Sequence, residues 1–152
     1  GLVSIFGYFI TRHLEKKKII EQQIREQKIP IYEEFVKFLF ELFAKEIEKK
    51  IDDESTQKSL LDFFANFNQK IIIWLSDNSL KAYIDYRKLI QDYAKKEAKT
   101  DKDNLDQLLA LERLFYEFRK DIGHKNRALL KGDLLSLFIN DLDKYKELLA
   151  GN

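Results

Sequence analysis

The chain opens with a stretch that passes abruptly from apolar to basic residues, Gly1-Leu-Val-Ser-Ile-Phe-Gly-Tyr-Phe-Ile10 followed by Thr11-Arg-His-Leu-Glu-Lys-Lys-Lys18. Membrane spans end this way on their cytosolic side, with aromatic rings at the level of the headgroups and Arg and Lys held in the cytosol. The apolar part supplies about half of the roughly 20 residues that a span requires. Because no initiator Met precedes Gly1, we expect the chain to begin inside a longer membrane helix.

The basic half of this stretch predicts contact with a lipid bilayer. Residues 12–28 contain six basic and three acidic side chains, an excess that an anionic inner leaflet attracts. Two alternatives stay open, an amphipathic helix lying on the membrane surface and an ordinary helix whose apolar face packs on the domain. The exit from a membrane is favoured because Ser4 is the only polar residue before Thr11. The side chains expected at the membrane interface are Tyr8, Phe9, Arg12, Lys16, Lys17 and Lys18.

Composition limits the remaining possibilities. A chain of 152 residues fits one domain and buries roughly two-thirds of its unfolded surface. It contains no cysteine, which excludes disulfides, thiolate catalysis and zinc sites with Cys ligands. The formal net charge is +1, so no overall field draws the protein to nucleic acid.

Apolar residues recur at spacings of three and four almost throughout, and the chain has only one proline and five glycines. This pattern predicts an all-α protein. We expect a membrane-exit helix that continues into a basic connector helix over residues 1–29, and a cytosolic bundle of about five helices over residues 30–152.

The helix boundaries follow from breaks in this pattern. The first helix is expected to end near Lys28, with a kink or break at Ile29 and Pro30. The later helices are predicted over about 31–51, over 57–75 with Ser55 or Thr56 as its cap, from a cap within Ser76-Asp-Asn-Ser79 to about Ala98, over 104–122 with an Asn104–Gln107 capping pair and a Gly123 stop, and over 133–149 with Asp133 as its cap.

Two of these helices indicate self-association. Leu14, Ile19, Ile20 and Ile24 form only a narrow apolar stripe on the connector, which suits a weakly self-associating helix. The helix over 31–51 is apolar over so wide an arc that it must be buried on more than one side, either at the centre of the bundle or against a second copy. A homo-oligomer through residues 14–43 is therefore expected.

A dense polar cluster, Arg119-Lys-Asp-Ile-Gly-His-Lys-Asn-Arg127, surrounds the end of the fifth predicted helix. In a structural interpretation of this cluster, cations in the last turn complement the helix dipole. Asp121 and His124 then accept hydrogen bonds from amides of the following loop. In an anion-binding interpretation, the residues that converge on a ligand are Arg119, Lys120, His124, Lys125, Asn126 and Arg127, with Asn126 reading a base or ribose.

A third interpretation is catalytic. Arg119 and His124 are separated by four residues, which resembles the R-x4-6-H motif of HEPN-type ribonucleases. That resemblance implies an all-α dimer in which the Arg and the His position phosphate and move protons at a 2′-hydroxyl. Gly123 departs from the pattern because it ends the helix before His124.

Other catalytic templates are missing from the sequence. Asp121 and His124 have a metal-ligand spacing, but no second carboxylate–His pair completes a bundle metal site. The sequence contains no glycine-rich phosphate loop and no nucleophile elbow. We therefore expect neither a metal nor a cofactor.

Two longer stretches resemble a known group of proteins. They are Ile20-Glu-Gln-Gln-Ile-Arg-Glu-Gln-Lys-Ile-Pro-Ile-Tyr-Glu-Glu34, and Leu111-Glu-Arg-Leu-Phe-Tyr-Glu-Phe-Arg-Lys-Asp-Ile-Gly-His-Lys-Asn126 through Asp141. Together they resemble a widespread family of uncharacterised bacterial proteins with one N-terminal membrane helix and a small cytosolic helical domain. The resemblance implies anchoring in the bacterial inner membrane, with the bulk of the chain in the cytoplasm.

The sequence thus predicts a membrane-tethered interaction or sensing module that acts on a protein partner and has no evident catalytic activity. The alternatives are a metal-independent HEPN-like ribonuclease using Arg119 and His124, with RNA as its partner, and a nucleotide-signal-binding module that uses the same cationic cluster.

Overall fold

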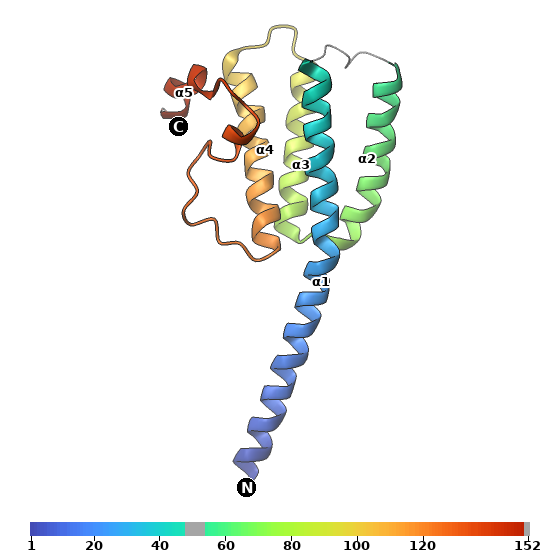
Figure 1. Cartoon of the computed structure of the whole chain (residues 1–152), viewed down its shortest axis with the longest axis vertical. Helices are drawn as coiled ribbons and strands as arrows, with labels where there is room; N and C mark the ends of the chain where they lie inside the picture. The colour runs from blue at the N-terminus through green and yellow to red at the C-terminus, as the bar shows by residue number, and fades with distance from the viewer. Residues whose placement is uncertain (48–53, 151–152) are drawn as a thin grey trace.

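The computed structural model describes residues 1–47 and 54–150, and within them it contains helices and no strand. The helices are α1 (Leu2–Ile47), α2 (Glu54–Trp74), α3 (Asp77–Ala94), α4 (Asp101–Asp121), η1 (Leu135–Leu137), η2 (Leu142–Tyr145) and α5 (Lys146–Ala150), where η marks a 3-10 helix. The predicted all-α class is confirmed, and the longer helices form a bundle (Figure 1). Among the described helices, none combines the length and the hydropathy needed to cross a bilayer.

Helix α1 has two parts with different surroundings. Its second half packs in the bundle, and its first half projects away from it (Figure 1). Every residue from 1 to 27 is exposed, and Lys28 is the first that is not. We call residues 2–27 the stalk. At about 1.5 Å of rise per residue, the stalk is roughly 40 Å long.

Of the kink or break predicted at Pro30, the break and the helix end near Lys28 are wrong, because α1 continues through this residue. Proline removes one amide donor and crowds the preceding turn, but Ile31, Tyr32 and Phe35 are buried directly after it, and their packing holds the helix together. The helix does change direction where it enters the bundle (Figure 1), as a proline commonly causes. The helix predicted over 31–51 is therefore the second half of α1, and its predicted end at Ile51 lies outside the described residues.

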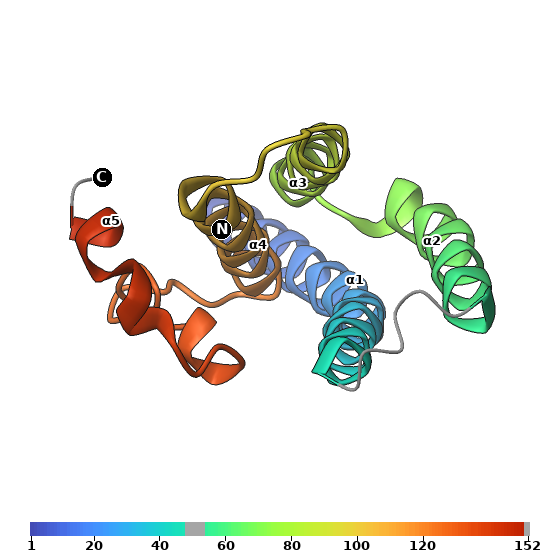
Figure 2. The same cartoon turned by 90° about the horizontal axis from the view of Figure 1, so that it is seen from above.

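The second half of α1 lies at the centre of the core. The ring of Phe35 packs 5.1 Å from that of Phe67 on α2, 6.1 Å from that of Tyr83 on α3 and 5.7 Å from that of Phe118 on α4, measured between centroids. The view from above shows α1 with α2 and α4 on different sides of it (Figure 2). Part of the burial predicted for this segment is thus met within the bundle, while Phe40 on the same half of α1 stays 45% exposed.

Helices α2 and α3 meet at a short turn. Helix α2 already includes Ser55 and Thr56, and Thr56 is buried within it, so the helix does not begin after these residues as predicted. Ser76 caps α3, and its side chain accepts the amide of Ser79 at 3.4 Å. Helix α3 ends at Ala94, four residues before the predicted end.

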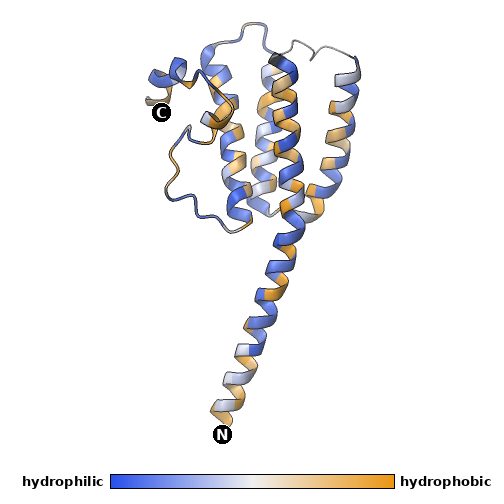
Figure 3. Cartoon of the chain, viewed as in Figure 1, coloured by the Kyte–Doolittle hydropathy of each residue, from blue (hydrophilic) through white to orange (hydrophobic). Residues whose placement is uncertain are grey.

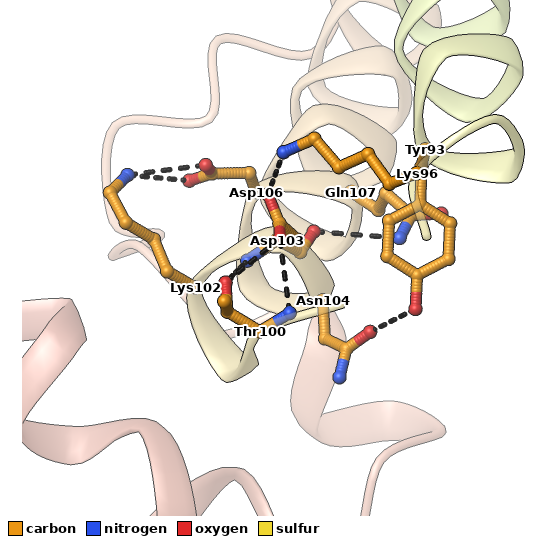
Figure 4. A network of polar contacts seen from close by, with 8 residues as sticks. All are labelled: Tyr93, Lys96, Thr100, Lys102, Asp103, Asn104, Asp106 and Gln107. Carbon is orange, nitrogen blue, oxygen red and sulfur yellow. Dashed lines mark hydrogen bonds and ion pairs between the residues drawn. The ribbon is translucent and has the colours of Figure 1, made fainter. Parts of the chain in front are cut away.

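The start of α4 is fixed by a capping box that involves other residues than predicted. The Thr100 hydroxyl accepts the Asp103 amide at 3.1 Å, and the Asp103 carboxylate accepts the Thr100 amide at 3.0 Å (Figure 4). Asn104 and Gln107, the predicted pair, lie inside the helix, and Asn104 instead accepts the Tyr93 hydroxyl. Thr100 is the better cap because its side chain precedes the first helical turn.

The helix predicted over 133–149 is also wrong, since η1, η2 and α5 occupy this segment. The buried carboxylate of Glu112 accepts the amides of Gly132 at 2.8 Å and Leu134 at 3.0 Å. Asp133 accepts the amide of Leu130 at 2.7 Å, so it does not cap a following helix. The long-range hydrogen bonds of Glu112 fix residues 132–134 against α4. The apolar spacing of residues 133–149 does not predict these bonds.

Candidate functional site

The predicted Gly123 stop of α4 is confirmed. The φ angle of Gly123 is +107°; its amide donates to the Lys120 carbonyl at 2.9 Å, and the His124 amide donates to the Arg119 carbonyl at 2.9 Å. This is a Schellman arrangement, which needs the left-handed conformation that glycine adopts at least cost.

The polar cluster that the sequence singles out is divided among three places around this stop. Asp121 turns toward the centre of the molecule, Arg119 lines one hollow of the surface, and Lys120, Lys125 and Asn126 line another. His124 and Arg127 are exposed and line neither hollow. The structure thus brings together only part of the predicted ligand-binding set.

Asp121 is the centre of a buried polar junction. Its carboxylate accepts hydrogen bonds from the Lys28 ammonium at 3.0 Å and from the Ser76 amide at 3.3 Å, and a short hydrogen bond from the Tyr32 hydroxyl. The side chains of Lys28 and Asp121 are only 11% and 8% exposed. We call Lys28, Tyr32, Ser76 and Asp121 the junction, because they tie the base of the stalk to the α2–α3 turn and to the end of α4.

The charge of this junction is set by its hydrogen bonds. Burial by itself would raise the pKa of Asp121, but the bonds from Tyr32, Lys28 and the Ser76 amide outweigh it and hold that pKa below its usual value. Burial, together with the hydrogen bond to Asp121, raises the pKa of Tyr32 far above that of a free tyrosine. The junction therefore holds an ionised carboxylate and a neutral phenol.

The first hollow is an apolar groove of about 490 Å³ between the second half of α1, α4 and η1. Arg119 lies at this groove, where its Nε donates to Asn126 Oδ1 at 2.8 Å. Asn126 in turn donates to the Tyr116 carbonyl at 3.1 Å and has a φ angle of +51°. The groove is lined by Ile29, Tyr32, Glu33, Val36, Lys37, Phe40, Phe115, Phe118, Arg119, Ile122, Leu134, Leu137 and Phe138.

The second hollow has about the same size, 520 Å³, and a different chemistry. Four of its lining residues are cationic, and two of these, Arg113 and Lys131, lie outside the predicted cluster. We call this site the cationic hollow. Its lining residues are Leu109, Glu112, Arg113, Tyr116, Glu117, Lys120, Lys125, Asn126, Leu129 and Lys131.

The sequence did carry a signal for Arg113. It lies two helical turns before Lys120, so both side chains share a face of α4. Lys131 had no such signal, because it reaches the hollow only through the loop that Glu112 fixes. Lys28 and Tyr32 were equally hidden, since they meet Asp121 from about 90 residues away along the chain, with separations of 93 and 89.

The predicted membrane-interface residues all lie on the stalk. Tyr8 and Phe9 are exposed, and Arg12 donates to the Tyr8 hydroxyl at 3.4 Å. Lys17 lies 4.0 Å from Glu21 along the same helix. In the described part of the chain, no three His, Asp or Glu side chains converge in a way that could hold a metal ion.

Comparison with protein-family models, with curated proteins and with solved structures gave no match to this chain. The resemblance to a bacterial membrane-anchored family stays a prediction.

Proposed function

We propose that this protein is a helical interaction or sensing module held at the cytosolic face of a membrane by the first turns of its stalk. The observation that supports the proposal most is the exposure of the stalk's apolar end. Leu2 is 79% exposed, Val3 87% and Phe6 69%, and the hydropathy colouring shows this end as apolar while the middle of the stalk is polar (Figure 3). Contiguous apolar surface of this kind marks a site of contact with another apolar phase.

Lipid is the occupant that the neighbouring charges favour. Lys16, Lys17 and Lys18 follow the apolar end within two to three helical turns, and all three are exposed. A helix that carries large apolar residues beside a cluster of cations binds an anionic interface through both effects. The order of the two, apolar first and basic afterwards, supports a proposal in which the bundle lies on the cytosolic side.

The junction fixes the base of the stalk to the bundle. Helix α1 is one continuous element from Leu2 into the core, and the Arg25 guanidinium lies 3.4 Å from the point where a Cβ on Gly123 would be. Together with Lys28 and Tyr32, this contact fastens the stalk to the end of α4. A partner bound to the bundle would therefore be held roughly 25 Å from the headgroups, the length of the stalk that follows its apolar end at Ile10.

Flotation of the protein with vesicles tests the proposal. A larger fraction of the chain should float with vesicles that contain phosphatidylserine than with neutral phosphatidylcholine vesicles. Added salt should lower the fraction that floats with the phosphatidylserine vesicles. The Phe6→Glu, Phe9→Glu chain should stay at the bottom of the gradient. Leu61→Glu is the matched control, since Leu61 is 72% exposed on α2 and should not change flotation.

The ribonuclease alternative has only the sequence spacing in its favour. Arg119 is held by Asn126, and His124 is exposed outside the apolar groove. Incubation with RNA beside a His124→Ala chain tests it. Cleavage that depends on His124 would replace the proposal above, and equal results for the two chains would remove the alternative.

A further inference from the structure

The cationic hollow contains more positive charge than its carboxylates neutralise. Arg113, Lys120, Lys125 and Lys131 line it, beside Glu112 and Glu117. Glu112 is buried and already accepts the amides of Gly132, Leu134 and Leu135 at 2.8, 3.0 and 3.4 Å. Glu117 accepts Lys120 at 2.8 Å. Both carboxylates are therefore engaged within the protein.

The other three cations keep their donors available. Among the described residues, Arg113, Lys125 and Lys131 make no hydrogen bond or ion pair within the protein. Asp85 lies near Arg113, but its carboxylate is bound to Lys81 at 2.8 Å, and that bond, with smaller contributions that include Arg113, lowers the pKa of Asp85. All three cationic side chains are exposed at the rim of the hollow.

We propose that the cationic hollow is a binding site for a small phosphorylated molecule that carries at least two negative charges. Guanidinium and ammonium groups are the side chains that bind phosphate oxygens most strongly, with Arg able to donate two parallel bonds. The volume of 520 Å³ lies in the range that holds ligands of nucleotide size. Leu109, Leu129 and the ring of Tyr116 supply apolar wall for the rest of the ligand.

The shape of the site favours a small ligand over a polymer. The cations surround a hollow on one side of α4, whereas a nucleic-acid surface requires cations spread along a face to follow a phosphate backbone. The whole chain has a net charge of only +1. This proposal does not rest on membrane attachment, because none of the residues concerned belongs to the stalk.

Calorimetric titration of the full chain with inorganic pyrophosphate, and separately with adenosine diphosphate, tests the site. Each compound should bind saturably, and sodium chloride at the same ionic strength as the ligand solution should not abolish the binding. Arg113→Gln, Lys125→Gln and Lys131→Gln should each weaken binding about tenfold, the effect of losing one charge-assisted bond. Lys58→Gln, an exposed cation on α2, is the matched control and should leave the affinity unchanged.

Two further arms identify the source of the phosphate. Soluble inositol trisphosphate and vesicles containing phosphatidylinositol bisphosphate are compared as competitors. The chain used carries Phe6→Glu and Phe9→Glu together with Lys16→Gln, Lys17→Gln and Lys18→Gln, so that neither the apolar end nor the lysines of the stalk contribute. Competition by the soluble compound alone indicates a free ligand, and competition by both indicates that a lipid headgroup also fits.

The proposal is overturned if pyrophosphate and adenosine diphosphate give no saturable heat, or if the three variants bind as tightly as the unmodified chain. Tight binding of an RNA oligonucleotide that Lys58→Gln weakens as much as Arg113→Gln would also overturn it, because the site would then be a spread surface. Circular dichroism of each variant without ligand confirms that a loss of binding is not a loss of fold.

Discussion

Asp121 shows how much a single side chain can decide in this molecule. The sequence suggested that it caps its own loop, but it joins three elements by accepting from Lys28, Tyr32 and Ser76. Its role could not be read from the sequence, because two of the three partners belong to a helix about 90 residues earlier. By contrast, Ser76 and Gly123 act on residues next to them in the chain, and the sequence predicted both a cap within residues 76–79 and the Gly123 stop.

Replacement of Asp121 by Ala should destabilise the protein by about 3 kcal/mol. The change leaves the buried Lys28 ammonium without its counter-charge, and the loss of one partner of a buried pair costs about 3–5 kcal/mol. The control is Glu34→Ala, which removes the ion pair with Lys70 between side chains that are 36% and 46% exposed and should cost less than about 1 kcal/mol. Urea unfolding measures both free energies, and equal losses would contradict the assigned role of the junction.

The stability contributed by Asp103 should depend on pH in the acidic range. The hydrogen bond from Lys96, with those from Thr100, lowers the pKa of Asp103 from 3.8 to about 2. A carboxylate with a lowered folded pKa stabilises the protein above its unfolded pKa, and this contribution disappears as the pH falls from about 4 to about 2. The thermal midpoint of Asp103→Asn should thus lie below that of the unmodified chain at neutral pH. The difference between the two midpoints should disappear as the pH falls from about 4 to about 2. A gap that is constant with pH would show that the carboxylate charge is not what matters.

At the scale of elements, the sequence predicted helices well where local signals decide. The existence of α2, α3 and α4 follows from apolar periodicity, although the predicted caps of α2 and α4 and the end of α3 differ from those observed. The prediction failed at the helix end expected near Lys28 and after Asp133 for a common reason. In both places tertiary contacts override the local signal, the burial of Ile31, Tyr32 and Phe35 in the first case and the bonds to Glu112 in the second.

The two halves of α1 should differ strongly in amide exchange. The stalk has no tertiary contacts before its base, and isolated helices are only marginally stable in water. Amides of residues 2–24 should therefore exchange much faster than those of residues 31–47, which open only with the bundle. Hydrogen exchange followed by mass spectrometry measures both, with α4 as the internal reference. Equal protection of the two halves would indicate instead that the stalk is packed against a second copy, as the predicted self-association through residues 14–43 would require.

At the scale of the whole molecule, the stalk separates two surfaces of different kind. Its free end is apolar (Figure 3). The bundle at the other end contains the apolar groove and the cationic hollow. The sequence indicated this division through its opening stretch, and the exposure of residues 1–27 agrees with it. The sequence predicted one site for the ligand-binding residues, whereas Arg119 and Lys120 point to different sides of α4, and His124 and Arg127 lie in the loop after α4, outside both hollows.

Quenching of tryptophan fluorescence by brominated lipids tests the membrane attachment most directly. The chain contains one tryptophan, Trp74 at the end of α2, which serves as a reporter of the bundle. In a Phe9→Trp, Trp74→Phe chain the only indole lies on the stalk. With vesicles that contain phosphatidylserine, brominated acyl chains should quench the stalk reporter and leave Trp74 of the unmodified chain unaffected. Emission from the stalk reporter that stays unquenched under these conditions would contradict the account.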